Sequence, residues 1–308
     1  MSNLYNSEGV TNAVDRVARR TPLLRAPGLS DQLGRPVWLK AECVQVTGSF
    51  KVRGAAARLS VLNDQERMRG VVSCSSGNHG RAVAYVAKEF GIPASVCVPE
   101  WVDPVKLEGI KRNGADAVLV GSTFDEAEAH ALELSERTGR TYISAYDDPW
   151  VIAGQGTIAL EILEQLGESP AAILAPLSGG GLLGGIASVF AERTQDQACR
   201  IVAVSAENAA VMLTSVRAGY PIELGEEETL ASALAGGIGL NNQHSFKLIQ
   251  DLVHEHMTVT EKQISDAMRY CAMTLRLVVE GGGAVAIAAV QSGVWKAEDI
   301  RDGPLVVL

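Results

Sequence analysis

From about residue 70 onward the sequence alternates short runs rich in β-branched residues with longer stretches of helical spacing. Strands are expected at 70–74, 94–99, 115–120, 141–146, 172–177 and 201–205. Most of the helical stretches stop at a glycine, a common helix terminator, and they cover 82–90, 105–113, 124–138, 151–166 and 183–192. This alternation is typical of βαβ units around a parallel sheet. It predicts an α/β protein of two lobes, each an open and mostly parallel sheet flanked by helices, with an active site in the cleft between them.

The composition excludes several classes of protein. With 308 residues, 47% hydrophobic and 20% charged, the chain has the make-up of an ordinary globular protein. Its net charge of −9 is spread without blocks of one sign, which argues against nucleic acid or an anionic membrane as a partner. Residues 1–10 lack the basic start and apolar run of a signal peptide, and 284–290 is far too short to span a bilayer. We expect a cytoplasmic protein.

Cysteines and histidines give no sign of a metal or disulfide framework. The odd number of cysteines, at wide spacings and without a C-x-x-C pair, fits reduced core residues at Cys43, Cys74, Cys97, Cys199 and Cys271. His254 and His256 form a lone H-x-H, which is more often a solvated strand edge than a metal site. Residues 219–242, rich in Gly, Ala and Glu, are expected to form a loop with a short helix.

Lys51 follows a turn of small residues, Thr47-Gly-Ser-Phe, and leads into an expected helix at 52–62. On this octapeptide alone, a solvated lysine at a helix start and a functional lysine are equally good interpretations. A lysine that forms a Schiff base must reach an aldehyde in a cleft with its amine partly deprotonated, which burial near other dipoles favours.

A second motif, Cys74-Ser-Ser-Gly-Asn-His-Gly80, stands where a strand ends and a helix begins. Free backbone N–H groups at a helix N-terminus attract an anion, and Ser75, Ser76 and Asn78 add side-chain donors. Ordinary N-capping is the alternative, although capping needs one such residue and this loop offers several.

A third motif is the glycine-rich loop Leu177-Ser-Gly-Gly-Gly-Leu-Leu-Gly-Gly185, again between a strand and a helix. Backbone amides approach a phosphate closely only where side chains are absent, so the loop is interpreted as a phosphate cradle. Gly179, Gly181 and Gly184 also fit G-x-G-x-x-G, with Glu207 positioned 23 residues later, which leaves a nicotinamide-dependent oxidoreductase as a rival. The glycine motif follows several βα units, whereas a dinucleotide-binding motif usually opens its domain, and this position weighs against the oxidoreductase. A structural tight turn is a third interpretation of the loop.

In this order the three motifs resemble one family, the fold-type II pyridoxal-phosphate enzymes related to tryptophan synthase β, in the branch of threonine/serine dehydratases and serine racemases. The resemblance runs nearly end to end. Besides the three motifs it rests on Thr21-Pro-Leu, Lys40-Ala-Glu, Asp148-Pro-Trp-Val-Ile-Ala-Gly-Gln-Gly-Thr157, Gly237-Ile-Gly-Leu-Asn241 and Glu280-Gly-Gly-Gly-Ala284.

The resemblance implies roles for particular residues. Lys51 is expected to carry pyridoxal 5′-phosphate as a Schiff base. The other expected cofactor-binding residues are Phe50 against the ring, Asn78 at the 3′-oxygen, Glu280, and the amides of Ser178, Gly179, Gly180, Gly181 and Leu182 at the phosphate. The substrate carboxylate is expected on Ser75, Ser76, Gly77, Asn78 and His79, with Gln155 helping to close the pocket.

The implied reaction converts a small β-hydroxy amino acid, such as L-threonine or L-serine, to a 2-oxo acid and ammonia. Lys51 removes the α-proton, and the bound cofactor acts as the electron sink. Ser76 also permits a serine or aspartate racemase, because the corresponding serine of racemases faces the lysine. The resemblance further implies a homodimer, a large cofactor-binding domain of residues 1–69 and 148–308, and a small mobile domain of residues 70–147.

Three departures from the family pattern shape the remaining expectations. Positions that hold a divalent cation in racemase-like members are Ser205 and Val211 here, so no metal is expected there, although Glu207 lies nearby. The glycines after Glu280 look more like dehydratases of hydroxyectoine breakdown, an alternative function. Relatives continue beyond the position of Leu308 into a serine that partners the pyridine nitrogen, which keeps a catalytically silent cofactor-binding protein among the alternatives.

Overall fold

The computed structural model describes residues 4, 7–75, 77–193, 199–298 and 300–308. The chain divides into two compact units. The first unit takes the residues up to Arg19 and Val44–Gln155, and the second takes Arg20–Cys43 and Gly156–Leu308. Our division into a domain of 1–69 with 148–308 and another of 70–147 stays a prediction.

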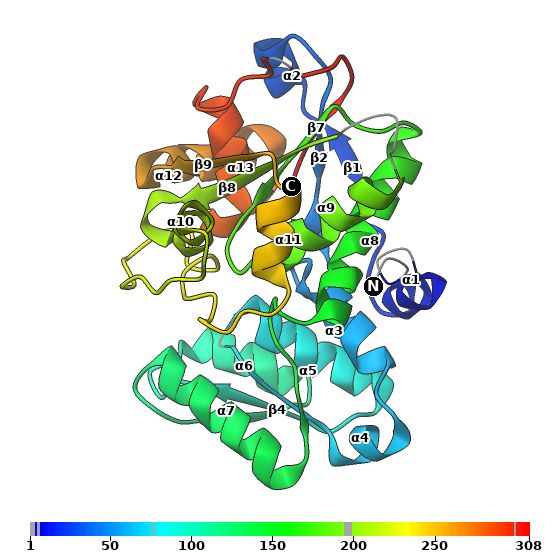
Figure 1. Ribbon diagram of the computed structural model, residues 1–308, viewed down its shortest axis with the longest axis vertical. Coiled ribbons are helices and arrows are strands. Elements are labelled where there is room, and N and C mark those ends of the chain that lie inside the picture. The colour runs from blue at the N-terminus through cyan, green and yellow to red at the C-terminus, as the bar shows by residue number, and fades with distance from the viewer. Residues whose placement is uncertain (1–3, 5–6, 76, 194–198, 299) are drawn as a thin grey trace. The chain divides into compact units, whose positions relative to one another are not determined.

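The first unit contains a four-stranded, fully parallel sheet of order β5-β4-β3-β6. Its strands are β3 (Val71–Cys74), β4 (Ala94–Val98), β5 (Asp116–Leu119) and β6 (Thr141–Tyr142). The connecting helices are α5 (Asn78–Phe90), α6 (Pro104–Arg112) and α7 (Phe124–Thr138), with α5 and α6 on one side of β4 and α7 on the other (Figure 1). Apolar residues on both sheet faces are therefore buried, as a parallel sheet requires.

Three further helices complete the first unit: α1 (Glu8–Asp15), α3 (Lys51–Ser60) and α4 (Asp64–Arg69). Alanine-rich α3 packs between α1 and α5, and its apolar side chains are buried. The small side chains of Ala55, Ala56 and Ala57 let neighbouring helices approach closely. Helix α3 is thus a core element whose first residue is Lys51.

The second unit contains a six-stranded sheet of order β1-β2-β10-β7-β8-β9, parallel except for β1. Its strands are β1 (Leu23–Arg25), β2 (Val37–Lys40), β7 (Ala172–Pro176), β8 (Arg200–Ala206), β9 (Glu255–Val259) and β10 (Leu305–Val307). The last strand of the chain, β10, is inserted between β2 and β7 in the interior of the sheet. Such long-range pairing closes the second unit around one core.

Helices cover both faces of this sheet. On one face, α2 (Pro27–Leu33), α12 (Glu261–Tyr270) and α13 (Gly281–Gln291) bury alternate residues of the strands, and Figure 1 shows α12 and α13 near β8 and β9. Ile173 points to the opposite face of β7 and is fully buried as well. The remaining helices are α8 (Pro149–Leu166), which begins in the first unit, α9 (Gly181–Arg193), α10 (Val211–Ala218) and α11 (Ser245–Leu252).

The observed elements confirm the predicted βαβ alternation and correct it in places. Helices α5 and α7 end at Gly91 and Gly139, both with positive φ, where the glycine stops were expected. The strand expected at 141–146 ends at Tyr142. Ile143 N still donates to Val72 O of β3 at 2.9 Å, but the carbonyls of Ile143 and Ala145 accept from side chains instead of from a neighbouring strand. The short helix expected within 219–242 is only a turn at 230–234. His256 lies on the edge strand β9 but is half-buried.

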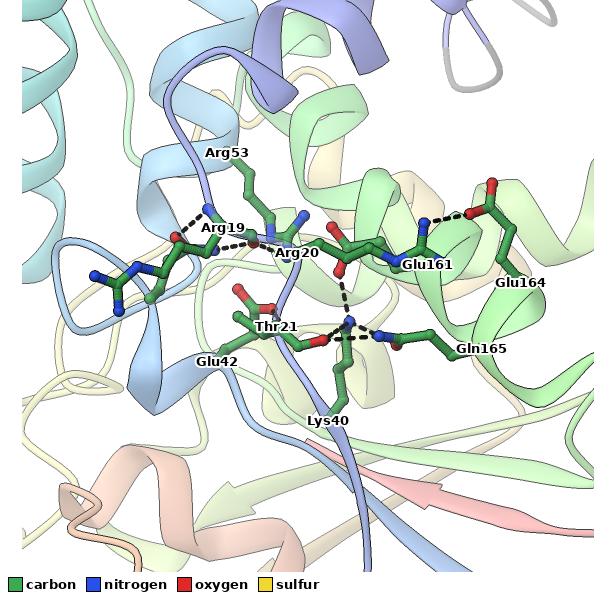
Figure 2. A network of polar contacts seen from close by, with 10 residues as sticks. Arg19, Arg20, Thr21, Lys40, Glu42, Arg53, Glu161, Glu164 and Gln165 are labelled. Atoms are coloured by element: carbon green, nitrogen blue, oxygen red, sulfur yellow. Dashed lines mark hydrogen bonds and ion pairs between the residues drawn. The ribbon is translucent and has the colours of Figure 1, made fainter.

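A polar network around Lys40 is buried in the second unit (Figure 2). The Lys40 ammonium is inaccessible to solvent and donates to Glu161 Oε2 at 2.5 Å, Thr21 O at 2.8 Å and Gln165 Oε1 at 2.9 Å. The Gln165 amide also donates to Thr21 O at 2.9 Å. A buried ammonium is tolerated only where its donors are satisfied and its charge is balanced, and this network does both.

No helix of the described residues is long and apolar enough to cross a membrane.

Replacing Lys40 by methionine should destabilise the protein by about 3–5 kcal/mol, because the Glu161 carboxylate would then be buried without its counter-charge. Urea unfolding of Lys40→Met measures this loss. In the double variant Lys40→Met/Glu161→Leu much of the loss should be recovered. A single variant as stable as the parent would show that the ion pair is not needed for the fold.

Candidate active site

Lys51 is fixed by a backbone carbonyl of the first unit. Its Nζ donates a hydrogen bond to Ala145 O at 2.7 Å and lies 5.3 Å from the centroid of the Phe50 ring. Lys51 is only partly exposed, although its position at the start of a helix would allow full solvation. The amine is therefore oriented within the protein fold, as expected of a functional lysine.

The segment that supplies this carbonyl, residues 143–148, is anchored along its length. Ile143 O accepts hydrogen bonds from Ser73 Oγ at 2.9 Å and from His79 Nε2 at 3.0 Å. At the other end, the Asp148 carboxylate caps α8 and forms an ion pair with Arg58 of α3 at 2.9 Å. Helix α3 is thus tied to the segment through both Lys51 and Arg58, which restricts the position of the Lys51 amine.

The start of helix α5 can bind an anion. The helix begins at Asn78, and its first backbone N–H groups lack intrahelical acceptors, as at every helix N-terminus. Gly77 N–H just before the helix donates to Ser75 Oγ at 3.2 Å. Ser75 O lies close to the helix, because a Cβ at Gly80 would come 2.2 Å from it. Asn78 Oδ1 accepts from Arg81 Nη2 at 3.1 Å. Ser76, expected to act in catalysis and in substrate binding, lies outside the described residues.

His79 is buried and neutral. Burial, together with the positive charge of Lys51, lowers the pKa of His79 to about 3. Its Nε2 faces Ile143 O, and its buried Nδ1 has no hydrogen-bond partner among the described residues. His79, which was predicted to bind the substrate carboxylate, therefore also contacts the 143–148 segment that holds Lys51.

Gln155 presents a second buried and unsatisfied polar group. It is only 1% exposed, and neither Nε2 nor Oε1 of its carboxamide has a partner within the described structure. The carboxamide lies against α3 one turn after Lys51, where a Cβ at Gly54 would come 2.4 Å from Nε2. A buried amide left without partners costs about 1–3 kcal/mol, which a ligand carrying both a donor and an acceptor would offset.

The glycine-rich loop links β7 to α9 in the second unit and fits a phosphate. Gly179, Gly180, Gly181 and Leu182 are buried, and Ser178 is half-buried. Gly180 has φ +85°, and a Cβ there would meet Ile249 Cγ1 at 2.9 Å and Met212 Cε at 3.0 Å. The loop runs into the N-terminus of the 13-residue helix α9, whose first amides have no intrahelical acceptor. These donors match the phosphate of pyridoxal phosphate.

The other second-unit positions singled out from the sequence differ in their surroundings. Glu280 is exposed at the N-cap of α13 and makes no capping hydrogen bond with its side chain. Ser205 is buried and donates to Leu177 O at 2.9 Å, while Val211 begins α10 and Glu207 lies exposed in a short 3₁₀ helix. The described parts of the chain contain no cluster of three or more His, Cys, Asp or Glu side chains that could hold a metal ion.

The sequence did not indicate the anchors of Lys51. Ala145 and Ile143 act through backbone carbonyl oxygens, which every residue possesses, so their residue types carry no signal. Ser73 lies inside a strand of buried residues, and the sequence indicated no role for it. Only the structure shows that His79 and Lys51 bind carbonyl oxygens two residues apart, those of Ile143 and Ala145.

Comparisons with known proteins show what the whole chain is similar to. Residues 14–308 match the family model described as "Pyridoxal-phosphate dependent enzyme". A putative threonine dehydratase of Sinorhizobium fredii is 38% identical over 296 residues, covering 95% of this chain and 88% of that protein. An L-threonine ammonia-lyase of Thermotoga maritima is 37% identical over 290 residues, covering 94% and 71%. The structure of maize serine racemase matches with a TM-score of 0.89 at 32% identity, covering 97% and 91%.

Gly180→Ala tests the glycine cradle, and Gly219→Ala is its matched control. Both glycines have φ +85°, but a Cβ at Gly219 meets no atom within 4 Å. The control should lose about 1–2 kcal/mol from the left-handed backbone, and Gly180→Ala about 1–3 kcal/mol more from overpacking. Titration with pyridoxal phosphate should show weaker binding only for Gly180→Ala. Equal cofactor affinity in the two variants would contradict the cradle.

His79 should make stability fall in mild acid. Its folded pKa of about 3 lies below the unfolded value near 6.5, so the unfolded chain binds the extra proton. The contribution is complete above pH 6.5 and declines by about 1.4 kcal/mol for each pH unit below it. Urea unfolding at several values between pH 7 and pH 5 should show a shallower pH dependence in His79→Gln than in the parent. Parallel curves would mean that His79 is not buried in its neutral form.

Proposed function

Because the chain belongs to the family of pyridoxal-phosphate dependent enzymes, we propose that it is a dehydratase that converts a small β-hydroxy amino acid, such as L-threonine or L-serine, to a 2-oxo acid and ammonia. The observation that carries the proposal is Lys51, whose amine is held on Ala145 O at the start of a buried helix. The two dehydratase-like relatives, both above 35% identity, support the reaction class.

Lys51 serves both as the attachment point of the cofactor and as the base. A carbonyl oxygen can only accept, so Ala145 O orients one N–H of the free Lys51 amine toward itself. When the amine is neutral, its lone pair can receive the α-proton of the substrate. Pyridoxal phosphate, when bound, supplies the electron sink that stabilises the charge left on the α-carbon.

The loop after β3 is assigned to the substrate carboxylate, and the loop after β7 is assigned to the cofactor phosphate. The substrate carboxylate is assigned to the loop of Ser75, Gly77, Asn78 and His79, where the first amides of α5 have no intrahelical acceptor. Ser75 N and Gly77 N already donate to Cys97 O at 3.3 Å and to Ser75 Oγ at 3.2 Å, so the amides of Asn78 and His79 are the donors for this carboxylate. Gln155 adds a carboxamide that needs partners. The amides of residues 178–182 bind the cofactor phosphate. In this arrangement Phe50 packs on the cofactor ring, Asn78 binds its 3′-oxygen, and Glu280 lies among the cofactor-binding residues.

Racemisation of serine or aspartate is the second candidate, favoured by the match to maize serine racemase. The two reactions share proton removal by Lys51 and differ in whether a proton returns to the opposite face or the hydroxyl leaves. Dehydration of a hydroxyectoine-derived substrate is a variant of the first candidate. Family membership removes the support for a nicotinamide enzyme, because the matched residues include both Lys51 and the glycine loop.

We also place the enzyme in the cytoplasm as a homodimer. Exposed apolar side chains in the second unit support association, with Met273 64% and Val278 89% exposed. Light scattering of the parent should give twice the mass of one chain, and Val278→Asp should shift the protein toward the monomer. A monomeric parent would contradict the dimer.

Lys51→Ala should abolish production of 2-oxo acid from L-threonine and L-serine and remove the visible absorption of the holoenzyme. Lys106→Ala, which changes an exposed lysine of α6 in the same unit, is the matched control and should retain both. Coupled assays of keto acid and ammonia, with chiral analysis of the amino acid, separate dehydration from racemisation. A parent that forms D-amino acid faster than keto acid would overturn the leading proposal in favour of the second candidate.

A further inference from the structure

His79 belongs to the start of α5 through its backbone and contacts the 143–148 segment through its side chain. Its backbone lies in the first turn of α5, so its N–H is among the helix N-terminal amides that can bind an anion. Its side chain reaches in the other direction and hydrogen-bonds Ile143 O at 3.0 Å.

The shared acceptor fixes the tautomer of the imidazole. Ile143 O can only accept, so the hydrogen bond to His79 requires a hydrogen on Nε2. Ser73 Oγ donates to the same oxygen at 2.9 Å and occupies its second lone pair. Because the ring is neutral, Nδ1 then carries no hydrogen, and this buried nitrogen has no partner among the described residues. The ring has one orientation that satisfies Ile143 O.

The carbonyl that His79 holds is two residues from the carbonyl that holds Lys51. Ile143 O is fixed by Ser73 and His79, and Ala145 O accepts from Lys51 Nζ at 2.7 Å. A continuous path therefore runs from the carboxylate loop through the imidazole and the 143–145 backbone to the Lys51 amine. Loss of the imidazole would leave Ser73 as the one side chain on Ile143 O.

We propose that His79 is a positioning residue, which sets the Lys51 amine relative to the carboxylate-binding loop by holding Ile143 O with its Nε2–H. The inference rests on the proposed function, because it assigns the loop to the substrate carboxylate and Lys51 to proton transfer. Proton transfer requires close alignment, and a displacement of about 1 Å reduces the rate about 100-fold. His79 thus acts on the rate of proton transfer rather than on substrate affinity.

Two substitutions separate this role from simple packing. In His79→Gln the side-chain amide can still donate to Ile143 O, whereas His79→Leu fills similar space without a donor. We expect His79→Leu to lower kcat about 100-fold with KM nearly unchanged, because the backbone amide of the loop remains. His79→Gln should recover kcat to within about tenfold of the parent. Equal kcat in the two variants, or a change confined to KM, would overturn the proposal.

A control variant addresses the loss of any histidine hydrogen bond. His254 Nδ1 accepts from Ile201 N at 3.1 Å, outside the candidate site. His254→Leu should keep the kcat of the parent. If it lowered kcat as much as His79→Leu, the effect would be general destabilisation and the positioning role would be lost.

Two readouts do not depend on dehydration. In ¹⁵N NMR of the holoenzyme, His79 should show a protonated Nε2 and an unprotonated Nδ1; the opposite tautomer would overturn the proposal even if His79→Leu failed to fold. Visible absorption follows the rate at which glycine displaces Lys51 from the cofactor, which should fall in His79→Leu and recover in His79→Gln. If the parent dehydrates no hydroxy amino acid but these two results hold, the positioning role stands and only the proposed reaction fails.

Discussion

The hydrogen bond from the Lys51 amine to Ala145 O is the interaction on which the candidate site of the first unit depends. A lysine carries a strongly hydrated ammonium on a flexible four-carbon stem, so a position at a helix start does not by itself fix where the amine lies. Here the amine is oriented by Ala145 O. The segment that supplies this carbonyl is held by Ser73 and His79 at Ile143 O and by the ion pair of Asp148 with Arg58. The chemistry proposed for Lys51 therefore starts from backbone geometry.

Buried polar groups in this protein fall into two kinds. Lys40 is fully buried, but its ammonium meets Glu161, Thr21 and Gln165, so the group stabilises the fold without need of a ligand. The Gln155 carboxamide and His79 Nδ1 are equally buried and have no partners among the described residues. Unsatisfied groups of this kind are uncommon in folded proteins. Others occur in the second unit, such as Ser169 Oγ and Tyr270 Oη. Gln155, however, lies against the helix of Lys51 at Gly54, and His79 binds Ile143 O, two residues from the carbonyl that holds Lys51.

The βαβ pattern was accessible from the sequence because local signals determine it. Glycine stops at Gly91 and Gly139 and runs of β-branched residues depend on a few neighbouring positions. The insertion of β10 between β2 and β7 has no such signal, since it pairs three residues at the end of the chain with strands far away in the sequence. For the same reason the strand expected to continue to residue 146 stopped at Tyr142, where side chains of β3 and α5 replace a neighbouring strand.

The site was predictable where it depends on residue type and hidden where it depends on the backbone. The sequence identifies the glycines that admit a phosphate and the lysine that follows a turn of small residues. Gly180 has the positive φ that only glycine adopts readily. Ala145 and Ile143 contribute carbonyl oxygens, so any amino acid at those positions would look the same in the sequence.

The most direct test of this account is to reduce the holoenzyme with borohydride, digest it and locate the pyridoxyl group by mass spectrometry. We predict that the label is found on Lys51 and that reduction removes the visible absorption band. A label on another lysine, or a protein that binds pyridoxal phosphate without any covalent attachment, would contradict the central claim.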